Sequence, residues 1–157
     1  MKTKKIRARE GDVFAIPLRD SGYAIGLIAR ENKKMTLGYF FNKIYPEAPE
    51  EVPASDLDLA NVIHIAKFSS LGIEEGVWPV LKSPFVFKRE EWPMPVFQMY
   101  DSLRKIYLAV VYDETLLHDK RHVIPEEEAK LLFESGLQGY GFVEARLTRL
   151  LQAGSGT

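Results

Sequence analysis

Residues 11–26 constrain the fold more than any other stretch, because they read as two short apolar strands around a polar turn. Val13–Leu18 supplies the first strand and Tyr23–Ala29 the second, with Arg-Asp-Ser-Gly between them. Pro17 has no backbone N–H to donate, which places the first strand at a sheet edge or at a bulge. The stretch therefore predicts a fold that begins with an antiparallel β-meander.

Later apolar runs predict more strands and then helices. Further strands are expected over residues 35–44, 62–68, 85–87, 96–99 and 106–112. A proline at 125, three glutamates after it and a glycine at 136 predict a helix over 125–134. A final helix is expected from the helical spacing of Val143, Leu147, Leu150 and Leu151. We expect an α+β fold: a curved antiparallel sheet, partly barrel-like, of about six strands, with two C-terminal helices.

Aromatic residues near the expected strands are interpreted as core. Trp78 and Trp92 each precede a proline and are expected to pack inside the protein rather than to form a ligand platform. Phe40 should face the opposite side of its strand from its neighbours Tyr39 and Phe41, because side chains alternate along a strand. Gly26 interrupts the second strand, which indicates a bend or a close approach of another group to the backbone.

Length and charge narrow the class of protein. A chain of 157 residues suits one domain, and residues 1–8 and 153–157 are expected to be flexible. The absence of cysteine excludes disulfides, thiolate metal sites and cysteine nucleophiles. A formal net charge of −1 lacks the basic field of a nucleic-acid binder. No apolar window is long enough to span a membrane, so a cytoplasmic protein is the default expectation.

The segment 45–59 is the most distinctive polar feature. It contains five carboxylates and three prolines and has no basic residue. It is either a solvated loop or a semi-rigid acidic surface that could steer and hold a basic partner. Under the second interpretation the contact residues are Glu47, Glu50, Glu51, Asp56 and Asp58.

A second polar stretch, 113–122, is expected to form a long loop after a strand. Asp113, Glu114, His118 and Asp119 are its candidate partner contacts. His118 and His122 are four residues apart, and on a helix they could share a metal ion. Because the stretch reads as a loop, no metal site and no cofactor is expected.

No catalytic motif stands out. Nucleophilic catalysis needs a serine or threonine beside a histidine, and the chain has no Gly-x-Ser-x-Gly elbow. His64 lies among Val and Ile residues, where a core or sheet-face histidine is the plainer interpretation than a catalytic base. A small hydrolase or nuclease with His64 or His118 as its base remains the alternative function.

Three short stretches occur in an order that resembles a known family. They are Gly-Asp-Val-Phe-Ala-Ile-Pro-Leu at 11–18 with Gly-Tyr-Ala-Ile-Gly at 22–26, Gly-Val-Trp-Pro-Val at 76–80, and Gly-Tyr-Gly-Phe-Val-Glu-Ala-Arg-Leu at 139–147. They resemble the N-terminal signature, the central Gly-x-Trp turn and the C-terminal end of the immunity protein 26 family of bacterial polymorphic toxin systems. Such a glycine-started meander also occurs in SH3-like barrels.

The resemblance implies a non-enzymatic protein that binds a cognate toxin domain and blocks the toxin's active site or its folding. It supplies no catalytic residues and does not say which residues touch the toxin. We expect the irregular segments 45–59 and 113–122 to set partner choice, with a monomer or weak homodimer and no nucleic-acid partner. A nucleic-acid-binding barrel is a third reading, which the net charge disfavours.

Overall fold

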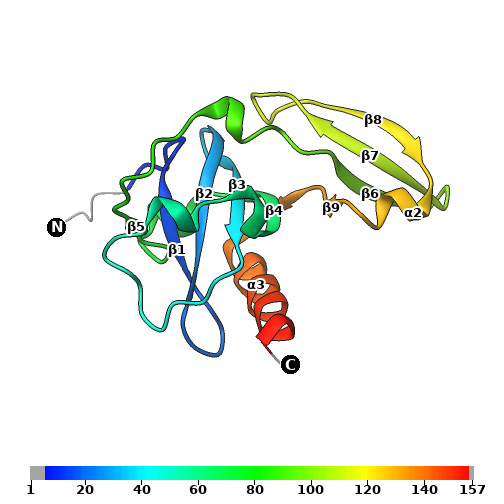
Figure 1. Ribbon diagram of the computed structural model, residues 1–157. Coiled ribbons are helices and arrows are strands. Elements are labelled where there is room, and N and C mark those ends of the chain that lie inside the picture. Colours follow the sequence, from blue (N-terminus) through cyan, green and yellow to red (C-terminus); the bar gives the residue numbers. More distant parts are fainter. Residues whose placement is uncertain (1–5, 156–157) are drawn as a thin grey trace.

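The computed structural model describes residues 6–155, and these residues form two β-sheets and three α-helices (Figure 1). The first sheet has the order β10-β4-β3-β2-β1-β5 and the second the order β8-β7-β6-β9. The strands of the first sheet are β1 (Val13–Pro17), β2 (Tyr23–Asn32), β3 (Met35–Phe41), β4 (Val62–Ser69), β5 (Val80–Leu81) and β10 (Leu137–Gln138). Those of the second are β6 (Phe97–Asp101), β7 (Ile106–Tyr112), β8 (Asp119–Ile124) and β9 (Phe133–Glu134).

The helices are short except for the last one. They are α1 (Leu71–Glu74), α2 (Glu126–Ala129) and α3 (Tyr140–Ser155), with single 3-10 turns at Ala54–Asp56, Leu59–Asn61 and Arg89–Glu91. Within the described residues, none of these helices is long and apolar enough to cross a membrane. Residues 1–5 and the side chains of 153–157 lie outside the described part of the chain, so the expectation of flexible ends stays a prediction.

The opening meander is confirmed. β1 and β2 pair antiparallel from Val13 opposite Leu27 to Pro17 opposite Tyr23. The Ala15 amide donates outward to the Pro79 carbonyl (2.9 Å), and Pro17 two residues later points the same way, past the end of β5. Because β5 pairs only with the first two residues of β1, the missing N–H of Pro17 costs no ladder hydrogen bond.

The α+β class is confirmed, and the architecture differs from one partly closed sheet. The two sheets do not close into a barrel, and the second sheet extends sideways from the first (Figure 1). We call residues 97–134, which hold β6 to β9 and α2, the arm. The helix expected over 125–134 is a single turn, because Phe133 leaves the helical path and pairs in parallel with Phe97 of β6. The strand expected over 85–87 has no strand pairing.

One face of the first sheet carries a cluster of four aromatic side chains. Phe14, Phe40, Phe68 and Trp78 are each fully buried. The Phe14 and Trp78 rings are stacked with centroids 5.5 Å apart, and Phe40 meets Phe14 edge to face at 5.9 Å. We call these four side chains the aromatic cluster. Offset and edge-to-face pairs of this kind stabilise a core beyond the area that they bury.

A glycine on β2 makes room for the aromatic cluster. A Cβ on Gly26 would lie 2.6 Å from Cζ of Phe14 and 3.1 Å from the Phe40 ring. Gly38 of β3 plays the same part, since its Cβ would lie 2.6 Å from Cε1 of Phe68. The close approach expected at Gly26 is therefore an approach by aromatic rings.

α3 covers the aromatic cluster. Its residues Val143, Leu147 and Leu151 are buried in the same hydrophobic core as the cluster. The Trp78 indole donates from Nε1 to Glu144 Oε2 of α3 (2.9 Å). The final helix is thus confirmed, and a polar contact as well as burial holds it on the sheet.

The opposite face of the first sheet packs against Trp92 and the arm. Tyr39 and Phe41 meet the Trp92 ring edge to face, with centroids 5.1 and 5.9 Å away, and Phe40 points to the other face. From the arm, Phe97 and Tyr112 join this second core. The predicted core positions of both tryptophans and the predicted alternation at residues 39–41 are confirmed.

Replacing Gly26 with alanine should destabilise the protein by about 1–3 kcal/mol, because the new methyl group would overlap the Phe14 ring. Urea denaturation followed by tryptophan fluorescence measures the free energy of unfolding. Gly141→Ala, in the first turn of α3, is the control, since a Cβ there meets only Arg19 Nη2 at 3.5 Å among the described residues and its backbone is not left-handed. Equal stability of the two variants would show that the rings do not need the space at Gly26.

Candidate partner-binding surface

The acidic segment 45–59 is an extended loop that buried side chains fix to the first sheet. Tyr45 and Tyr23 exchange backbone hydrogen bonds of 2.8 Å at its start. Val52 is fully buried, and its amide donates to the Lys82 carbonyl (2.9 Å). Leu57 is 5% exposed. Because these anchors hold the backbone, the carboxylates between them are presented on a defined surface.

Two of the five carboxylates in this loop accept hydrogen bonds from groups in the loop or next to it. Asp56 accepts hydrogen bonds from the hydroxyl of Tyr45 and from Lys43 Nζ, the latter at 2.9 Å. These hydrogen bonds, with that from Tyr45 the larger, hold the pKa of Asp56 below its ordinary value of 3.8. Asp58 accepts from the amide of Ala60 (2.9 Å) and caps the second 3-10 turn.

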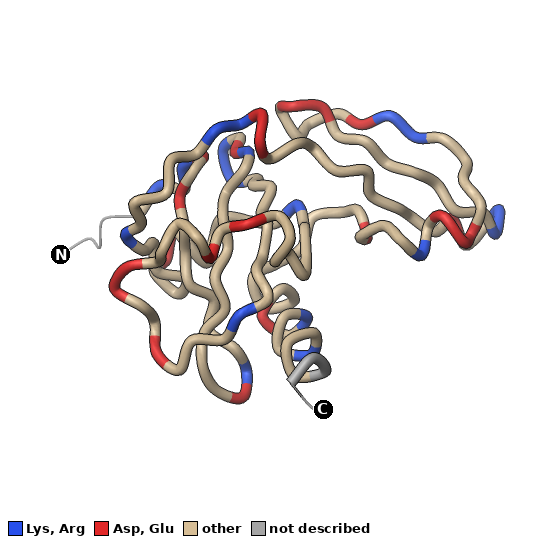
Figure 2. Tube along the Cα trace, in the orientation of Figure 1, with Lys and Arg blue, Asp and Glu red and all other residues tan. Residues whose placement is uncertain are grey.

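The other three carboxylates, Glu47, Glu50 and Glu51, are exposed. We call them the acidic triad. None of them has a hydrogen bond or ion pair with another side chain of residues 6–152. In Figure 2 the acidic positions of this loop lie at the lower left of the molecule, away from the arm. The triad is therefore an acidic surface on an anchored loop, with no ion pair to the side chains that the structure describes.

The prediction of a long loop over residues 113–122 is wrong in part. Residues 119–124 form β8, which pairs antiparallel with β7 from Asp119 opposite Tyr112 to Ile124 opposite Tyr107. Five of its six residues are exposed, so burial gave no periodic signal for a strand. Only residues 113–118 form the turn. Asp113 Oδ1 accepts from the amide and the hydroxyl of Thr115, at 3.1 and 2.7 Å, and these bonds lower its pKa.

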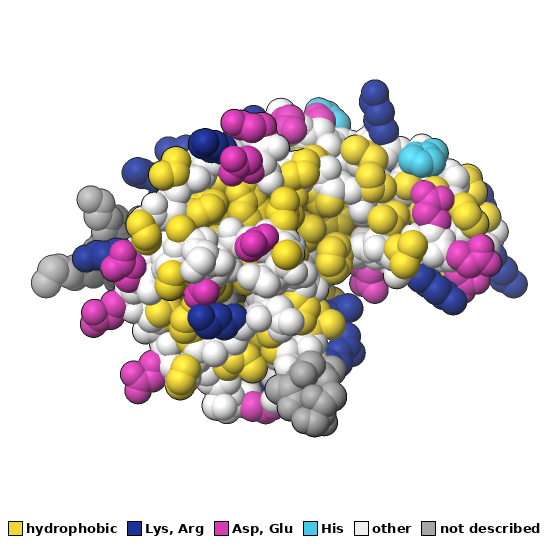
Figure 3. All heavy atoms as spheres, in the orientation of Figure 1, with side chains coloured by type: hydrophobic (Ala, Val, Ile, Leu, Met, Phe, Trp, Pro, Cys, Tyr) yellow, Lys and Arg dark blue, Asp and Glu magenta, His cyan; other side chains and the backbone are white. Residues whose placement is uncertain are grey.

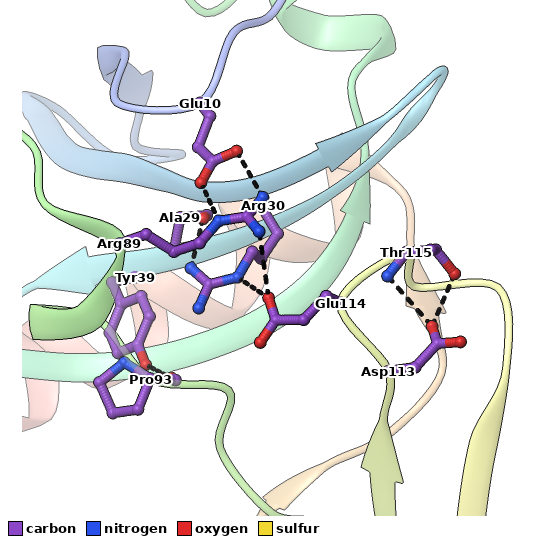
Figure 4. A network of polar contacts seen from close by, with 9 residues as sticks. All are labelled: Glu10, Ala29, Arg30, Tyr39, Arg89, Pro93, Asp113, Glu114 and Thr115. Atoms are coloured by element: carbon purple, nitrogen blue, oxygen red, sulfur yellow. Dashed lines mark hydrogen bonds and ion pairs between the residues drawn. The ribbon is translucent and has the colours of Figure 1, made fainter.

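Glu114 fastens this turn to the first sheet (Figure 4). It pairs with Nε of Arg30, whose side chain is 3% exposed, and lies 3.8 Å from Arg89. Arg30 also donates to the Ala29 carbonyl (2.6 Å), and Arg89 forms two hydrogen bonds with Glu10, at 2.6 and 2.9 Å. A buried guanidinium needs such partners. The main role of Glu114 is therefore to hold the arm in place against the first sheet.

Two further contacts hold the same turn. Asn32 Nδ2 donates to the Thr115 carbonyl (2.7 Å), and Lys67 Nζ donates to the Leu116 carbonyl (2.9 Å). Leu116 is fully buried although its φ is +63°. We call these contacts, together with the Arg30–Glu114 pair, the latch, because they join the arm to β2 and β4.

His118 and Asp119 lie at the end of the β7–β8 hairpin that the latch holds against the first sheet. With Val111, Tyr112, Asp113 and Lys120 they line a hollow of about 390 Å³. Asp119 pairs with Arg121 (2.7 Å). His122 stands opposite Ala109 within β8, so the two histidines are not on a helix. Among the described residues, no three His, Cys, Asp or Glu side chains come together as a possible metal site.

His64 lies on the β4 face that carries the aromatic cluster. It is 4% exposed, its ring contacts Phe40 and Phe133 with centroids 5.7 and 5.6 Å away, and its Nε2 lies 3.3 Å from Gln138 Oε1. Burial lowers the pKa of His64, and the contact with Gln138 opposes this only in part. The position of His64 on a buried sheet face is therefore confirmed, and this environment favours the neutral imidazole.

Sequence reasoning missed a concave surface between α3 and the arm, which we call the notch. His64, Gln138 and Glu134 line a hollow of about 250 Å³ there, with Arg146 and Lys130 at its rim. The notch brings together β4, β6, β9, β10 and α3, with Lys130 from the residues that follow α2, and Figure 3 shows its opening at the lower right. One sequence feature could have indicated this surface: Arg146 and Arg149 are one turn apart beside the apolar face of the last helix.

Comparison with known proteins identifies the family. The chain matches the family model of Immunity protein 26 over residues 9–107. No curated protein and no solved structure matches it. The matched range contains the meander at 11–26 and the turn at 76–80, whereas the stretch 139–147 lies beyond it. The chain belongs to the immunity protein 26 family.

Replacing Asp56 with asparagine should cost about 1 kcal/mol of stability at pH 7, because the bonds from Tyr45 and Lys43 would lose a charged acceptor. The folded-state pKa is lowered, so this contribution is present above about pH 4 and is lost as pH falls through that pKa. Urea unfolding at pH 7 and at pH 3 should therefore show a smaller difference from the parent at the lower pH. Glu47→Gln, which removes an unpaired carboxylate, should change neither value.

Proposed function

We propose that this protein neutralises a cognate toxin domain by binding it, and that it does so without catalysis. Membership of the immunity protein 26 family over residues 9–107 is the observation that carries the proposal. The setting that we propose is the cytoplasm of a bacterium with a polymorphic toxin system, where the immunity protein protects the producing cell and its kin. It acts there as a monomer or weak homodimer.

We treat the whole chain, 1–157, as one immunity domain. The family match ends in β7, within the arm. The residues after it pack on the matched part, since Val143 and Leu147 share a core with Phe14 and Trp78. Neither α3 nor the arm has a separate core of comparable size, which supports one folding unit.

The acidic triad is the proposed first contact with the toxin. Unpaired carboxylates on an anchored loop create a local negative potential, which speeds encounter with a basic partner and weakens as salt rises. Asp56 and Asp58 border the triad and would support the same surface. The hairpin end with Asp113, Glu114, His118 and Asp119 is a weaker candidate, because Asp113, Glu114 and Asp119 already have partners within the protein.

A stable complex of this kind buries roughly 800 Å² on each partner. The toxin domain encoded beside this gene is the partner to test. Mixed with the purified immunity protein, it should form a complex by size-exclusion chromatography, and co-expression should restore growth of cells that make the toxin. Growth arrest in the presence of the folded immunity protein, with no complex formed, would overturn the proposal.

Reversing Glu47, Glu50 and Glu51 to lysine should weaken toxin binding by about tenfold or more, mainly through slower association. Surface plasmon resonance at low and high salt measures this, and the variant should lose most of the salt dependence. Reversing the exposed Glu75, Glu90 and Glu91 is the control with the same change in charge. Unchanged affinity of the first variant would remove the loop from the interface.

Binding and catalysis differ in stoichiometry. If the protein acts by binding, toxin activity should fall linearly with added immunity protein and end near one equivalent. An enzyme that destroys the toxin or its product would protect far below one equivalent. His118→Ala and His64→Gln remove the two candidate bases and should leave the titration unchanged; loss of protection by a folded His variant would favour the hydrolase or nuclease alternative, for which the hollow beside His64 and Glu134 offers a place.

A further inference from the structure

We propose that the notch is a second protein-binding surface, and that it takes an Asp- and Glu-rich segment of a partner protein through Lys130, Arg146 and Arg149. The proposal does not rest on the acidic triad, whose loop lies on the other side of the molecule in Figure 1. It also does not depend on which toxin is bound, because the chemistry of the surface defines the segment.

The notch is long enough for a peptide segment. Three hollows, of about 410, 380 and 250 Å³, follow one another along it. Arg146 lines the first and the third, while Gln98 and Glu134 line the second and the third. Because neighbouring hollows share these side chains, the three hollows lie next to one another along the notch.

The charges of this surface are opposite in sign to the excess charge of the chain. Its lining holds three cations, Lys130, Arg146 and Arg149, and one carboxylate, Glu134, in a protein of net charge −1. Figure 3 shows Lys and Arg side chains beside the notch. A carboxylate-rich segment is the complementary partner for such a surface.

The cations are available to an incoming carboxylate. Arg146 lies 3.6 Å from Glu134 and Lys130 lies 3.7 Å from Glu126, which are loose and partly exposed pairs. Arg149 is exposed and has no ion pair with any side chain of residues 6–152. The Arg146 guanidinium stacks over the Phe142 ring at 5.2 Å, which holds it in place before binding and reduces the entropy that binding costs.

The exposed aromatic side chains that line the notch between its charged residues favour a protein partner over a nucleic acid. Tyr100 and Phe142 are 47% and 48% exposed, and Tyr100 stands 4.8 Å from Tyr107. Exposed Tyr, Phe and Arg side chains around a concavity are the composition of protein–protein hot spots.

The test is fluorescence anisotropy with a fluorescein-labelled hexaglutamate peptide at low salt, followed by amide NMR shifts to locate the site. We expect saturable binding, with shifts in α3 and β9. Arg146→Glu combined with Arg149→Glu should weaken it by about tenfold or more. Lys34→Glu with Lys88→Glu makes the same charge change at exposed positions away from the notch and should leave affinity within about twofold.

Absence of saturable binding would overturn the proposal, and so would equal binding by the notch variant and the control variant. Tighter binding of a single-stranded oligonucleotide at the same amides would also overturn it, in favour of a nucleic-acid site. If Arg146→Glu impairs folding in a thermal melt, Lys130→Glu with Arg149→Glu, both at exposed positions, replaces it. No toxin enters this experiment, so its failure leaves the proposed function untouched.

Discussion

The packing of the aromatic cluster against Gly26 and Gly38 is the constraint on which the rest of this structure depends. The Phe14 and Phe68 rings occupy the space where those two residues would carry a Cβ. A shift of one residue in the pairing of β1, β2 or β3 would place a side chain in that space and turn the phenylalanines to the other face. The cluster therefore fixes strand register, and with it the positions of every loop that leaves the first sheet.

The arm depends on a different interaction. Its hydrophobic contacts with the first sheet include those of Phe97, Val110 and Tyr112, near its base. The latch adds directional contacts, since buried Arg30 requires the carboxylate of Glu114. Burial alone would allow the arm to slide, whereas a guanidinium–carboxylate pair fixes one orientation. The arm in that orientation forms one wall of the notch. Arg30 and Glu114, which are 84 residues apart in the sequence, therefore shape a surface that contains neither of them.

The sequence predicts elements well where burial decides them. The side chains of residues 13–41 alternate between two buried faces. This pattern was enough to predict their strands, the opposite orientation of Phe40 relative to Tyr39 and Phe41, and the role of Pro17. β8 was not readable, because its pairing with β7 comes from backbone hydrogen bonds while five of its six side chains face solvent. Helical signals at 125–134 were real but local, and the pairing of Phe133 with Phe97 overrode them.

The roles of the charged residues in the candidate site were equally hard to predict from the sequence. Glu114 and the three glutamates of the acidic triad are alike in the sequence, since all stand in polar segments beside a strand or a proline. They differ in their partners: the fold brings Arg30 to Glu114, whereas no cation among the described residues forms an ion pair with the triad. A sequence can therefore nominate acidic contacts, and only the tertiary structure separates those that stabilise the protein from those that are free to bind.

This separation bears on how an immunity protein can change its partner. The residues that fix register, such as Phe14 and Gly26, are fully buried or pressed against buried rings, and a substitution there costs stability. The acidic triad contributes to no core and to no ion pair among the described side chains, so substitutions there change surface charge at little cost in folding free energy. Because folding and recognition rest on different residues, a new partner can be accommodated by the loop while the scaffold stays the same.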